Sequence, residues 1–150
     1  MSLLRLPLAV YETLRDHGEE AFPNESCGAL LGRPIQEGWQ VETLVRATNA
    51  HTESQCDRYE IAPVELVKIA RQARDGGLEI AGFYHSHPGH PAQWSATDLE
   101  EAHWLGCVYV ITEVIDGKAT LTSAYLLAGM SEEGKHFEPQ TIQVDDGGPR

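Results

Sequence analysis

An apolar run that ends in two histidines constrains the fold of this chain more than any other segment. Residues 78–85, LEIAGFYH, are rich in aromatic and branched side chains, follow a Gly-Gly pair and lead to Pro88. This pattern predicts a buried β-strand that stops at the proline. Side chains two positions apart on a strand share a face. We therefore expect His85 and His87 to project the same way from the end of the strand.

The loop after this strand returns to a third candidate ligand. Ser95 or Thr97 can cap a helix that begins near Asp98, which places the carboxylate of Asp98 in or beside its first turn. Two imidazoles and one carboxylate are the protein ligands of a zinc site whose fourth position stays open, and such a site activates water. The spacing therefore predicts that His85, His87 and Asp98 bind Zn²⁺.

Five side chains leave alternatives open at this point. Ser95 and Asp98 also fit a simple Ser-x-x-acid capping pair, which requires no chemistry. Glu101 lies one helical turn beyond Asp98 and is the rival third ligand. His90 fits either an approach to the metal or substrate, or a solvated histidine in a loop. Trp94 fits either a cover over a bound substrate or a packing anchor for the loop.

The combined motif resembles that of the JAMM (MPN-plus) family of zinc metalloproteases. That family carries an upstream glutamate, then His-x-His-Pro, then Ser-x-x-Asp. Here the three parts are Glu25 in the segment PNESCG, the segment HSHP that ends at Pro88, and the segment SATD that ends at Asp98. No catalytic position is substituted, which argues against the inactive MPN-minus relatives.

The resemblance implies a role for each matching residue. His85, His87 and Asp98 would hold zinc. Glu25 would take a proton from the metal-bound water and later deliver it to the leaving amine, while Ser95 would hydrogen-bond the oxyanion on the scissile carbonyl. The residues alone do not single out Glu25, so this assignment rests on the resemblance. The competing acids are Glu19, Glu20, Glu60 and Glu79.

The order of predicted elements indicates an α/β fold with a mixed β-sheet flanked by helices. The resemblance implies the three-layer sandwich of JAMM/MPN and cytidine-deaminase-like proteins. A chain of 150 residues with 41% hydrophobic residues supports one core. We expect a single metallopeptidase domain over residues 1–144 and a frayed tail over residues 145–150.

Hydrophobic periodicity and turn residues give the expected elements. Strands are predicted over residues 3–6, 28–33, 39–46, 59–61, 78–85, 107–113, 119–127 and 137–144. Helices are predicted over residues 7–22, over residues 63–75 and from residue 98 onward. The pair Asp116-Gly117 predicts a two-residue hairpin turn between the strands that flank it.

Charge and composition bound the partners. The formal net charge is −12, from 23 acidic and 11 basic residues, and no basic run is present. We expect no nucleic-acid partner, because phosphate neutralisation requires clustered Lys and Arg. The sequence shows neither a signal-peptide pattern nor an apolar run of the roughly 20 residues that a membrane helix needs, so we expect a cytoplasmic protein with no membrane partner.

The three cysteines contain no Cys-x-x-Cys pair and are expected to be reduced thiols. Cys27 lies close to Glu25 and could be taken for a nucleophile. We interpret Cys27 as a core residue, because a metal-activated water already supplies the nucleophile.

The resemblance implies a substrate that ends in Gly-Gly. Family members cleave after the C-terminal Gly-Gly of ubiquitin, of ubiquitin-like proteins or of sulfur-carrier proteins. This chain departs from the eukaryotic deubiquitinating relatives, since it lacks their long insertions and offers only residues 48–58 and 128–136 as candidate loops. We therefore expect a small ubiquitin-like or sulfur-carrier protein as its partner. The identity of that partner, the type of bond and the oligomeric state stay open.

Two functions from other classes compete with the protease interpretation. A non-hydrolytic binding module could use the same cleft, but binding alone requires neither Glu25 nor Ser95. A zinc deaminase has a related architecture, but its His-x-Glu with a downstream Pro-Cys-x-x-Cys is absent from this sequence.

Overall fold

The computed structural model describes residues 2–146, which form seven strands and three helices. In chain order these are β1 (Leu3–Pro7), α1 (Leu8–Ala21), β2 (Cys27–Ile35), β3 (Gly38–Ala47), α2 (Pro63–Asp75), β4 (Glu79–Pro88), α3 (Ala96–Glu101), β5 (Val108–Ile115), β6 (Lys118–Ala128) and β7 (His136–Asp145).

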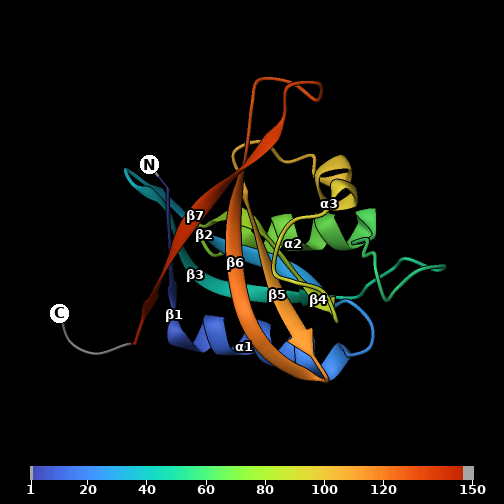
Figure 1. The fold of residues 1–150 in the computed structure, drawn as a ribbon. Coiled ribbons are helices and arrows are strands. Elements are labelled where there is room, and N and C mark those ends of the chain that lie inside the picture. Colours follow the sequence, from blue (N-terminus) through green and yellow to red (C-terminus); the bar gives the residue numbers. More distant parts are fainter. Residues whose placement is uncertain (1, 147–150) are drawn as a thin grey trace.

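All of the described strands belong to one mixed sheet that curls and closes on itself (Figure 1). Their order is β1-β3-β2-β4-β5-β6-β7, and β1 closes the sheet by pairing in parallel with both β3 and β7. The strand that carries the two histidines, β4, lies between β2, which is antiparallel to it, and β5, which is parallel. The predicted α/β class with a mixed sheet and flanking helices is confirmed.

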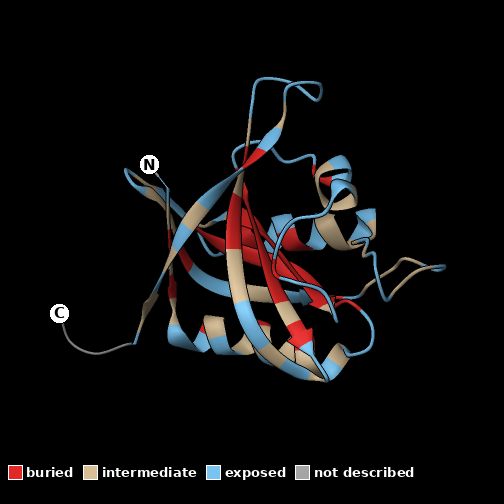
Figure 2. Ribbon diagram, in the orientation of Figure 1, coloured by how far each residue is buried: buried red, intermediate tan, exposed pale blue. Residues whose placement is uncertain are grey.

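The two faces of the curled sheet each have their own core. On one face, Leu6 of β1 and Leu14 of α1 belong to a buried cluster that fills the curl. On the other face, Ile69 of α2 belongs to a second cluster with Phe83 and Tyr109 of the central strands. Figure 1 shows α1 on one side of the sheet and α2 with α3 on the other, and Figure 2 shows that the central strands β4 and β5 are buried along most of their length. The histidine strand is therefore held from both faces.

Several predicted elements have the bounds that the sequence indicated. The helix over residues 63–75 is α2, and the first strand and first helix fall within one residue of their predicted ends. The turn between β5 and β6 has positive φ angles at Asp116 (51°) and Gly117 (81°). Two positive φ angles in a two-residue connection are the signature of a type I′ turn, which matches the twist of the flanking strands.

Two predicted elements were wrong in detail. Residues 59–61 form no strand. The backbone N–H of Glu60 donates to the side chain of Asn49 in the same loop, and the ring of Tyr59 stacks on His85. The helix that begins near Asp98 ends at Glu101, since Ala102 takes an extended conformation (φ −85°, ψ 120°) and is buried in the core.

The C-terminal end of the described chain pairs with its beginning. β7 runs to Asp145, which pairs with Pro7 of β1. Residues 147–150 of the predicted tail lie outside the described residues. Across residues 2–146, none of the helices combines the length and the apolar character needed to cross a lipid bilayer.

The close approach of β4 and β5 depends on Gly82. A Cβ atom at this position would collide with the backbone carbonyl of Val108 on β5. We expect Gly82→Ala to lower the free energy of unfolding by about 2 to 4 kcal/mol, because two backbones would have to separate. Chemical denaturation measures this difference.

Gly76→Ala is the matched control for Gly82→Ala. Gly76 follows α2 with an ordinary φ of −88°, and the atom nearest to a Cβ placed there is 3.6 Å away. We expect this variant to stay within about 1 kcal/mol of the wild type. Equal stabilities for the two variants would show that contact with β5 does not limit position 82.

Candidate metal centre

β4 presents both histidines on the same buried face of the sheet. Its antiparallel register with β2 places His85 opposite Cys27, and its parallel register with β5 places His87 opposite Glu113. Backbone pairing therefore continues through both histidines as far as Pro88. Since alternate residues of a strand share a face, the two imidazoles lie side by side, with ring centroids 5.0 Å apart.

Asp98 reaches the histidines from the first turn of α3. The side chain of Ser95 accepts a hydrogen bond from the backbone N–H of Asp98 at 3.0 Å, and Asp98 Oδ2 accepts one from the backbone N–H of Ser95 at 2.9 Å. This reciprocal pair is a capping box, which fixes both side chains relative to the helix. The capping interpretation of Ser95 and Asp98 and the ligand interpretation of Asp98 thus describe one arrangement.

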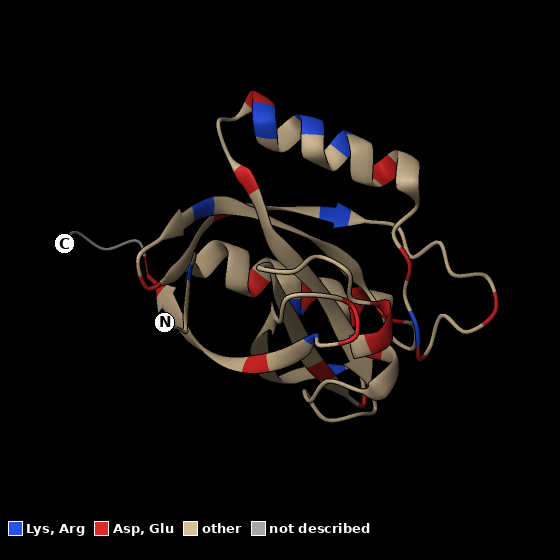
Figure 3. Cartoon of the chain, turned by 90° about the horizontal axis from the view of Figure 1, so that it is seen from above, with Lys and Arg blue, Asp and Glu red and all other residues tan. Residues whose placement is uncertain are grey.

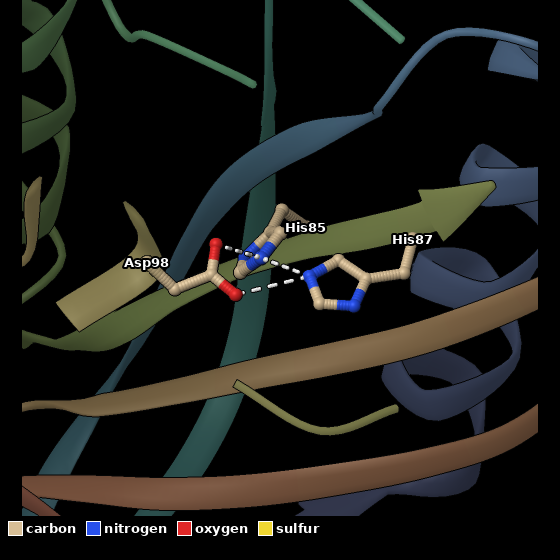
Figure 4. Close-up of side chains that lie close together, drawn as sticks. All are labelled: His85, His87 and Asp98. Carbon is tan, nitrogen blue, oxygen red and sulfur yellow. Dashed lines mark hydrogen bonds and ion pairs between the residues drawn. The ribbon is translucent and has the colours of Figure 1, made fainter. Parts of the chain in front are cut away.

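Three donor atoms of these side chains converge on one point (Figure 4). His85 Nε2 and His87 Nε2 are 3.2 Å apart, His85 Nε2 is 3.2 Å from Asp98 Oδ1, and His87 Nε2 is 3.0 Å from Asp98 Oδ2. Ligand bonds of 2.0 to 2.1 Å in a tetrahedral site separate neighbouring ligand atoms by roughly 3.3 Å. The spacing of the two nitrogens, and of each nitrogen from one carboxylate oxygen, fits a single ion, so these residues are compatible with a metal site.

A backbone carbonyl fixes the tautomer of His87. His87 Nδ1 lies 2.8 Å from the carbonyl oxygen of Pro91. A carbonyl only accepts hydrogen bonds, so Nδ1 carries a proton. The neutral ring would then present its Nε2 lone pair to a bound metal, whereas without a metal an Nε2–H group donates to Asp98 Oδ2. Holding the second ring nitrogen in this way is how proteins usually orient a histidine that binds a metal.

Glu113 holds the loop that supplies this carbonyl. Its Oε2 accepts a hydrogen bond from the backbone N–H of Ala92 at 3.0 Å, while its Oε1 accepts one from Thr120 Oγ1 at 2.7 Å. The hydroxyl of Tyr125 donates to the carbonyl of Ala92 at 3.2 Å. Both polar backbone groups of Ala92 are thereby bound, which keeps the neighbouring Pro91 carbonyl in place.

His85 is oriented by an aromatic ring, because no described residue gives its Nδ1 a hydrogen bond of the kind that holds His87. Its Nδ1 is buried, and no described residue forms a hydrogen bond with it. The ring of Tyr59 stacks on the imidazole with centroids 4.6 Å apart and an interplanar angle of 25°. Tyr59 therefore limits the rotation of the imidazole, whose Nδ1 has no polar partner among the described residues.

Burial and neighbouring charges set the ionisation of the cluster. Burial lowers the pKa of His85, which favours the neutral ring that a metal requires. Burial acts in the same sense on His87, but the hydrogen bonds to Asp98 and Pro91 outweigh it and raise the pKa of His87. Burial would raise the pKa of Asp98, but the hydrogen bonds with the two imidazoles hold it far below its usual range, so Asp98 is ionised.

Glu25 lies beside the cluster and is buried. It lies two residues before β2, and the next residue, Ser26, pairs with Ser86 of β4 through two hydrogen bonds of 2.8 and 3.2 Å. Only 3% of Glu25 is exposed, and its Oε1 is buried without a hydrogen bond from any described residue. Burial raises the pKa of Glu25 to about 8; the imidazole of His87 opposes this shift, and the charges of Asp98 and other acids add to it.

Two cavities lie on either side of the cluster. The first, of about 400 Å³, is lined by Glu25, His87, Trp94 and Ser95 among others. The second, of about 340 Å³, has Asp98 beside an aromatic and aliphatic wall. That wall is formed by Tyr59, Ile61, Leu66, Phe83, Trp104 and Tyr109. Arg58 and Thr97 line both cavities, so the two spaces are neighbours along one cleft.

The surroundings of this cleft are acidic. Residues 48–62 contribute Glu53, Asp57 and Glu60 against one arginine, and α3 contributes Asp98, Glu100 and Glu101. Figure 3 shows acidic positions in this loop and in α3, whereas several of the Lys and Arg positions lie along α2.

The rival candidates for the third ligand and for the general base lie away from the cluster or are not buried. Glu101 points away from the cluster to Arg58, with a nitrogen-to-oxygen distance of 3.6 Å. Of the five upstream acids only Glu25 is buried: Glu19 accepts a backbone hydrogen bond from Ala119, Glu20 pairs with Arg46, and Glu60 and Glu79 are exposed.

The remaining candidates from the sequence lie near the cleft but outside the cluster. His90 is exposed, with its ring centroid 6.2 Å from that of His87. Trp94 is 41% exposed, lines the first cavity and packs against Phe137 with ring centroids 5.7 Å apart. Cys27 is buried, and burial raises the pKa of its thiol to about 12, so it is not a thiolate.

Sequence reasoning missed two residues that shape the site, Tyr59 and Glu113. Glu113 had a signal, because it is a carboxylate inside an otherwise apolar strand. Tyr59 was assigned to a strand without a role in the site.

Residues 7–139 match the model of a family described as prokaryotic homologs of the JAB domain. A desampylase from Haloferax volcanii is 35% identical over 126 residues, which cover 80% of this chain and 88% of that protein. A probable TtuB-protein conjugate cleaving protease from Thermus thermophilus is 32% identical over 102 residues, which cover 68% of this chain and 65% of that protein.

Solved structures share the fold. The solution structure of a protein from Desulfitobacterium hafniense superposes with a TM-score of 0.78 at 25% identity, over 96% of this chain and 95% of that one. The solution structure of a protein from Salinibacter ruber superposes with a TM-score of 0.69 at 37% identity, over 97% of this chain and 95% of that one.

The stacking of Tyr59 on His85 predicts an effect on metal affinity. We expect Tyr59→Ala to weaken zinc binding by about 10- to 100-fold, because His85 loses the ring that stacks on it. Tyr59→Phe keeps the ring and should bind zinc within about threefold of the wild type. Competition against a chelator of known affinity measures both values. An unchanged zinc affinity in Tyr59→Ala would show that the stacking does not contribute to metal binding.

The buried carboxyl of Glu25 predicts a pH-dependent stability in the metal-free protein. Its pKa of about 8 in the folded chain exceeds the ordinary value of 4.5, so the folded state binds this proton more tightly than the unfolded state does. Stability contributed by the protonated group is present below pH 4.5 and is lost as the pH rises to about 8. Glu25→Gln should therefore gain stability over the wild type across this range, by on the order of 3 kcal/mol at pH 8.

Urea unfolding at pH 5 and pH 8 in the presence of a chelator tests this expectation. Glu20→Gln is the control, because Glu20 is exposed. A stability difference between Glu25→Gln and the wild type that does not change with pH would show that Glu25 titrates normally.

Proposed function

This chain belongs to the family of prokaryotic homologues of the JAB domain, and we propose that it is a zinc-dependent metallopeptidase acting on protein conjugates. The bond it hydrolyses follows the C-terminal Gly-Gly of a ubiquitin-like or sulfur-carrier protein. The observation that carries this proposal is the convergence of His85, His87 and Asp98 beside the buried carboxyl of Glu25, whose Oε1 has no hydrogen bond from any described residue. The predicted resemblance to the JAMM family is confirmed by the family match.

The donor set supports zinc as the metal. Two imidazole nitrogens and one carboxylate oxygen form the protein part of many catalytic zinc sites. The burial of His85 and the low pKa of Asp98 favour the forms of these two groups that bind a cation, and the Pro91 carbonyl orients the His87 ring so that Nε2 faces the centre of the cluster. When bound in such a site, zinc lowers the pKa of water and polarises a carbonyl group.

Glu25 is proposed to move the proton during hydrolysis. Its carboxyl lines the same cavity as His87, and its Oε1 is free to accept a proton from the attacking water. A pKa raised toward neutral pH suits a group that first accepts a proton and then returns it to the leaving amine.

Ser95 is proposed to stabilise the oxyanion that forms on the scissile carbonyl. Its Oγ accepts the backbone N–H of Asp98, which leaves the hydroxyl proton available for a third group. Ser95 lines the cavity that also contains Glu25, so both groups face the space where the scissile bond would lie. A preorganised neutral donor in such a position typically lowers the barrier by a few kcal/mol.

The relatives support the class of substrate. One is named a desampylase and another a protease that cleaves TtuB-protein conjugates, so enzymes of this type act on conjugates of small proteins. This chain is accordingly an enzyme of the same hydrolytic type. A tail without Cβ atoms suits a cleft in which the substrate backbone has to pass close to the metal ligands. The acidic surroundings of the cleft favour association with a partner that has a basic face.

A panel of Gly-Gly-terminated substrates tests the proposal. The zinc-loaded protein is incubated with ubiquitin-like and sulfur-carrier proteins joined through their Gly-Gly end to a lysine side chain, to a linear peptide or to a single amino acid, and mass spectrometry identifies the products. We expect cleavage directly after the second glycine of at least one member. Glu25→Gln should bind one zinc per chain and lose turnover by orders of magnitude.

Two further variants separate the third ligand from its neighbour. Asp98→Ala should lose both zinc and activity, while Glu101→Ala should keep both. The reverse pattern would show that Glu101, and not Asp98, is the third ligand. Near-normal turnover by Glu25→Gln would show that Glu25 is not the general base.

A further inference from the structure

The loop between β3 and α2, residues 48–62, is closed at its neck by one side chain. Asn49 Oδ1 accepts hydrogen bonds from the backbone N–H groups of His51 at 3.0 Å and Glu60 at 3.2 Å. The backbone N–H of Ala50 also donates to the carbonyl of Glu60 at 2.8 Å. The two ends of the loop therefore meet at Asn49 without forming a strand pair.

The Nδ2 group of the same amide reaches the backbone of Glu25. Asn49 Nδ2 donates to the carbonyl of Arg58 at 2.9 Å and to the carbonyl of Glu25 at 3.3 Å. Two bonds accepted and two donated satisfy the main hydrogen-bonding capacity of an asparagine amide. A flipped amide would place its NH₂ group against two N–H donors, so the pattern of neighbours assigns this orientation.

The backbone of Glu25 is anchored by this loop. Its N–H donates to the carbonyl of Gln55 at 2.7 Å, and its carbonyl accepts from Asn49 Nδ2. The Oε1 atom of its side chain has no hydrogen bond from any described residue. The position of the carboxyl consequently depends on where the backbone of Glu25 is held, and both polar groups of that backbone are bound by residues of the loop.

We propose that Asn49 is a positioning residue for Glu25. Its amide binds the closed loop to the backbone of the general base, so that the shape of the loop and the place of the carboxyl are fixed together. This inference rests on the proposed role of Glu25 in hydrolysis. Asn49 itself touches neither the metal ligands nor the reacting atoms and acts through Glu25.

Asn49→Asp tests the inference with little change in shape. The new carboxylate still accepts from His51 and Glu60, but both donor bonds, to Arg58 and Glu25, are lost. We expect kcat to fall by about 10- to 100-fold with KM within threefold and with one zinc per chain, because a displacement of about 1 Å at a catalytic group has effects of this size. The substrate is the Gly-Gly fusion that the wild type cleaves fastest. Asn49→Ala, which adds no charge, gives the same comparison where the aspartate variant does not fold.

Asn24→Asp is the matched control for charge. Asn24 is exposed and adjacent to Glu25 in the chain, so its substitution adds the same negative charge near the same carboxyl without cutting a bond to the loop. We expect this variant to keep kcat within about twofold of the wild type. A loss as large as that of Asn49→Asp would assign the effect to charge alone and overturn the inference.

A second comparison asks whether Asn49 acts through Glu25. In the Glu25→Gln background, followed under single-turnover conditions, adding Asn49→Ala should cause no further loss of rate, since residues that act as a unit are not additive. An equal fold-loss in both backgrounds, or an unchanged kcat for the single variant, overturns the inference and leaves the proposed function standing. A wild type that cleaves no member of the panel overturns the proposed function, and the inference with it.

Discussion

The candidate site depends on the backbone register of β4. Pairing with β5 continues to the end of the strand, and pairing with β2 on the other side reaches His85, so both imidazoles lie on one buried face. A slip of one residue would turn both rings to the opposite face, because side chains alternate along a strand. The same two pairings bring Glu25 and Glu113 to the histidines, the first from the start of β2 and the second from β5. The loop and α3 then add the carboxylate to a frame that the sheet has already set.

Within this frame, burial and charge act in opposite directions on neighbouring carboxyls. Asp98 receives hydrogen bonds from two imidazoles and from a backbone N–H, and these offset the cost of removing a carboxylate from water. Glu25, which lines the same cavity as His87, has no such donor at its Oε1 among the described residues and tends to hold its proton. Neighbouring titratable groups with pKa values driven apart are typical of acid and base assignments in enzymes. One carboxyl is therefore suited to binding a cation and the other to transferring a proton.

Much of the site was predictable because its signals are local. His85 and His87 follow from the period of a strand, Ser95 and Asp98 from capping at a helix start, and the Asp116-Gly117 turn from the twist of a hairpin. Closure of the sheet by β1 was not predictable in this way, since β1 is short and its partners β3 and β7 lie far along the sequence. The roles of Tyr59 and Asn49 depend on the shape of a loop without helix or strand, and no periodicity describes such a loop. Glu25 required the resemblance, because its burial, which distinguishes it from the other acids, appears only in three dimensions.

A single oxygen of Asp98 belongs to both the helix and the cluster. Oδ2 accepts the backbone N–H of Ser95 at 2.9 Å and lies 3.0 Å from His87 Nε2. A helix as short as Ala96–Glu101 gains little stability from its own backbone hydrogen bonds. By mass action, an ion bound to these side chains would stabilise the helical conformation in which the Asp98 carboxylate reaches it. Formation of the six-residue helix α3 and binding of an ion at the cluster are thus coupled equilibria. The helix is more ordered when the site is filled.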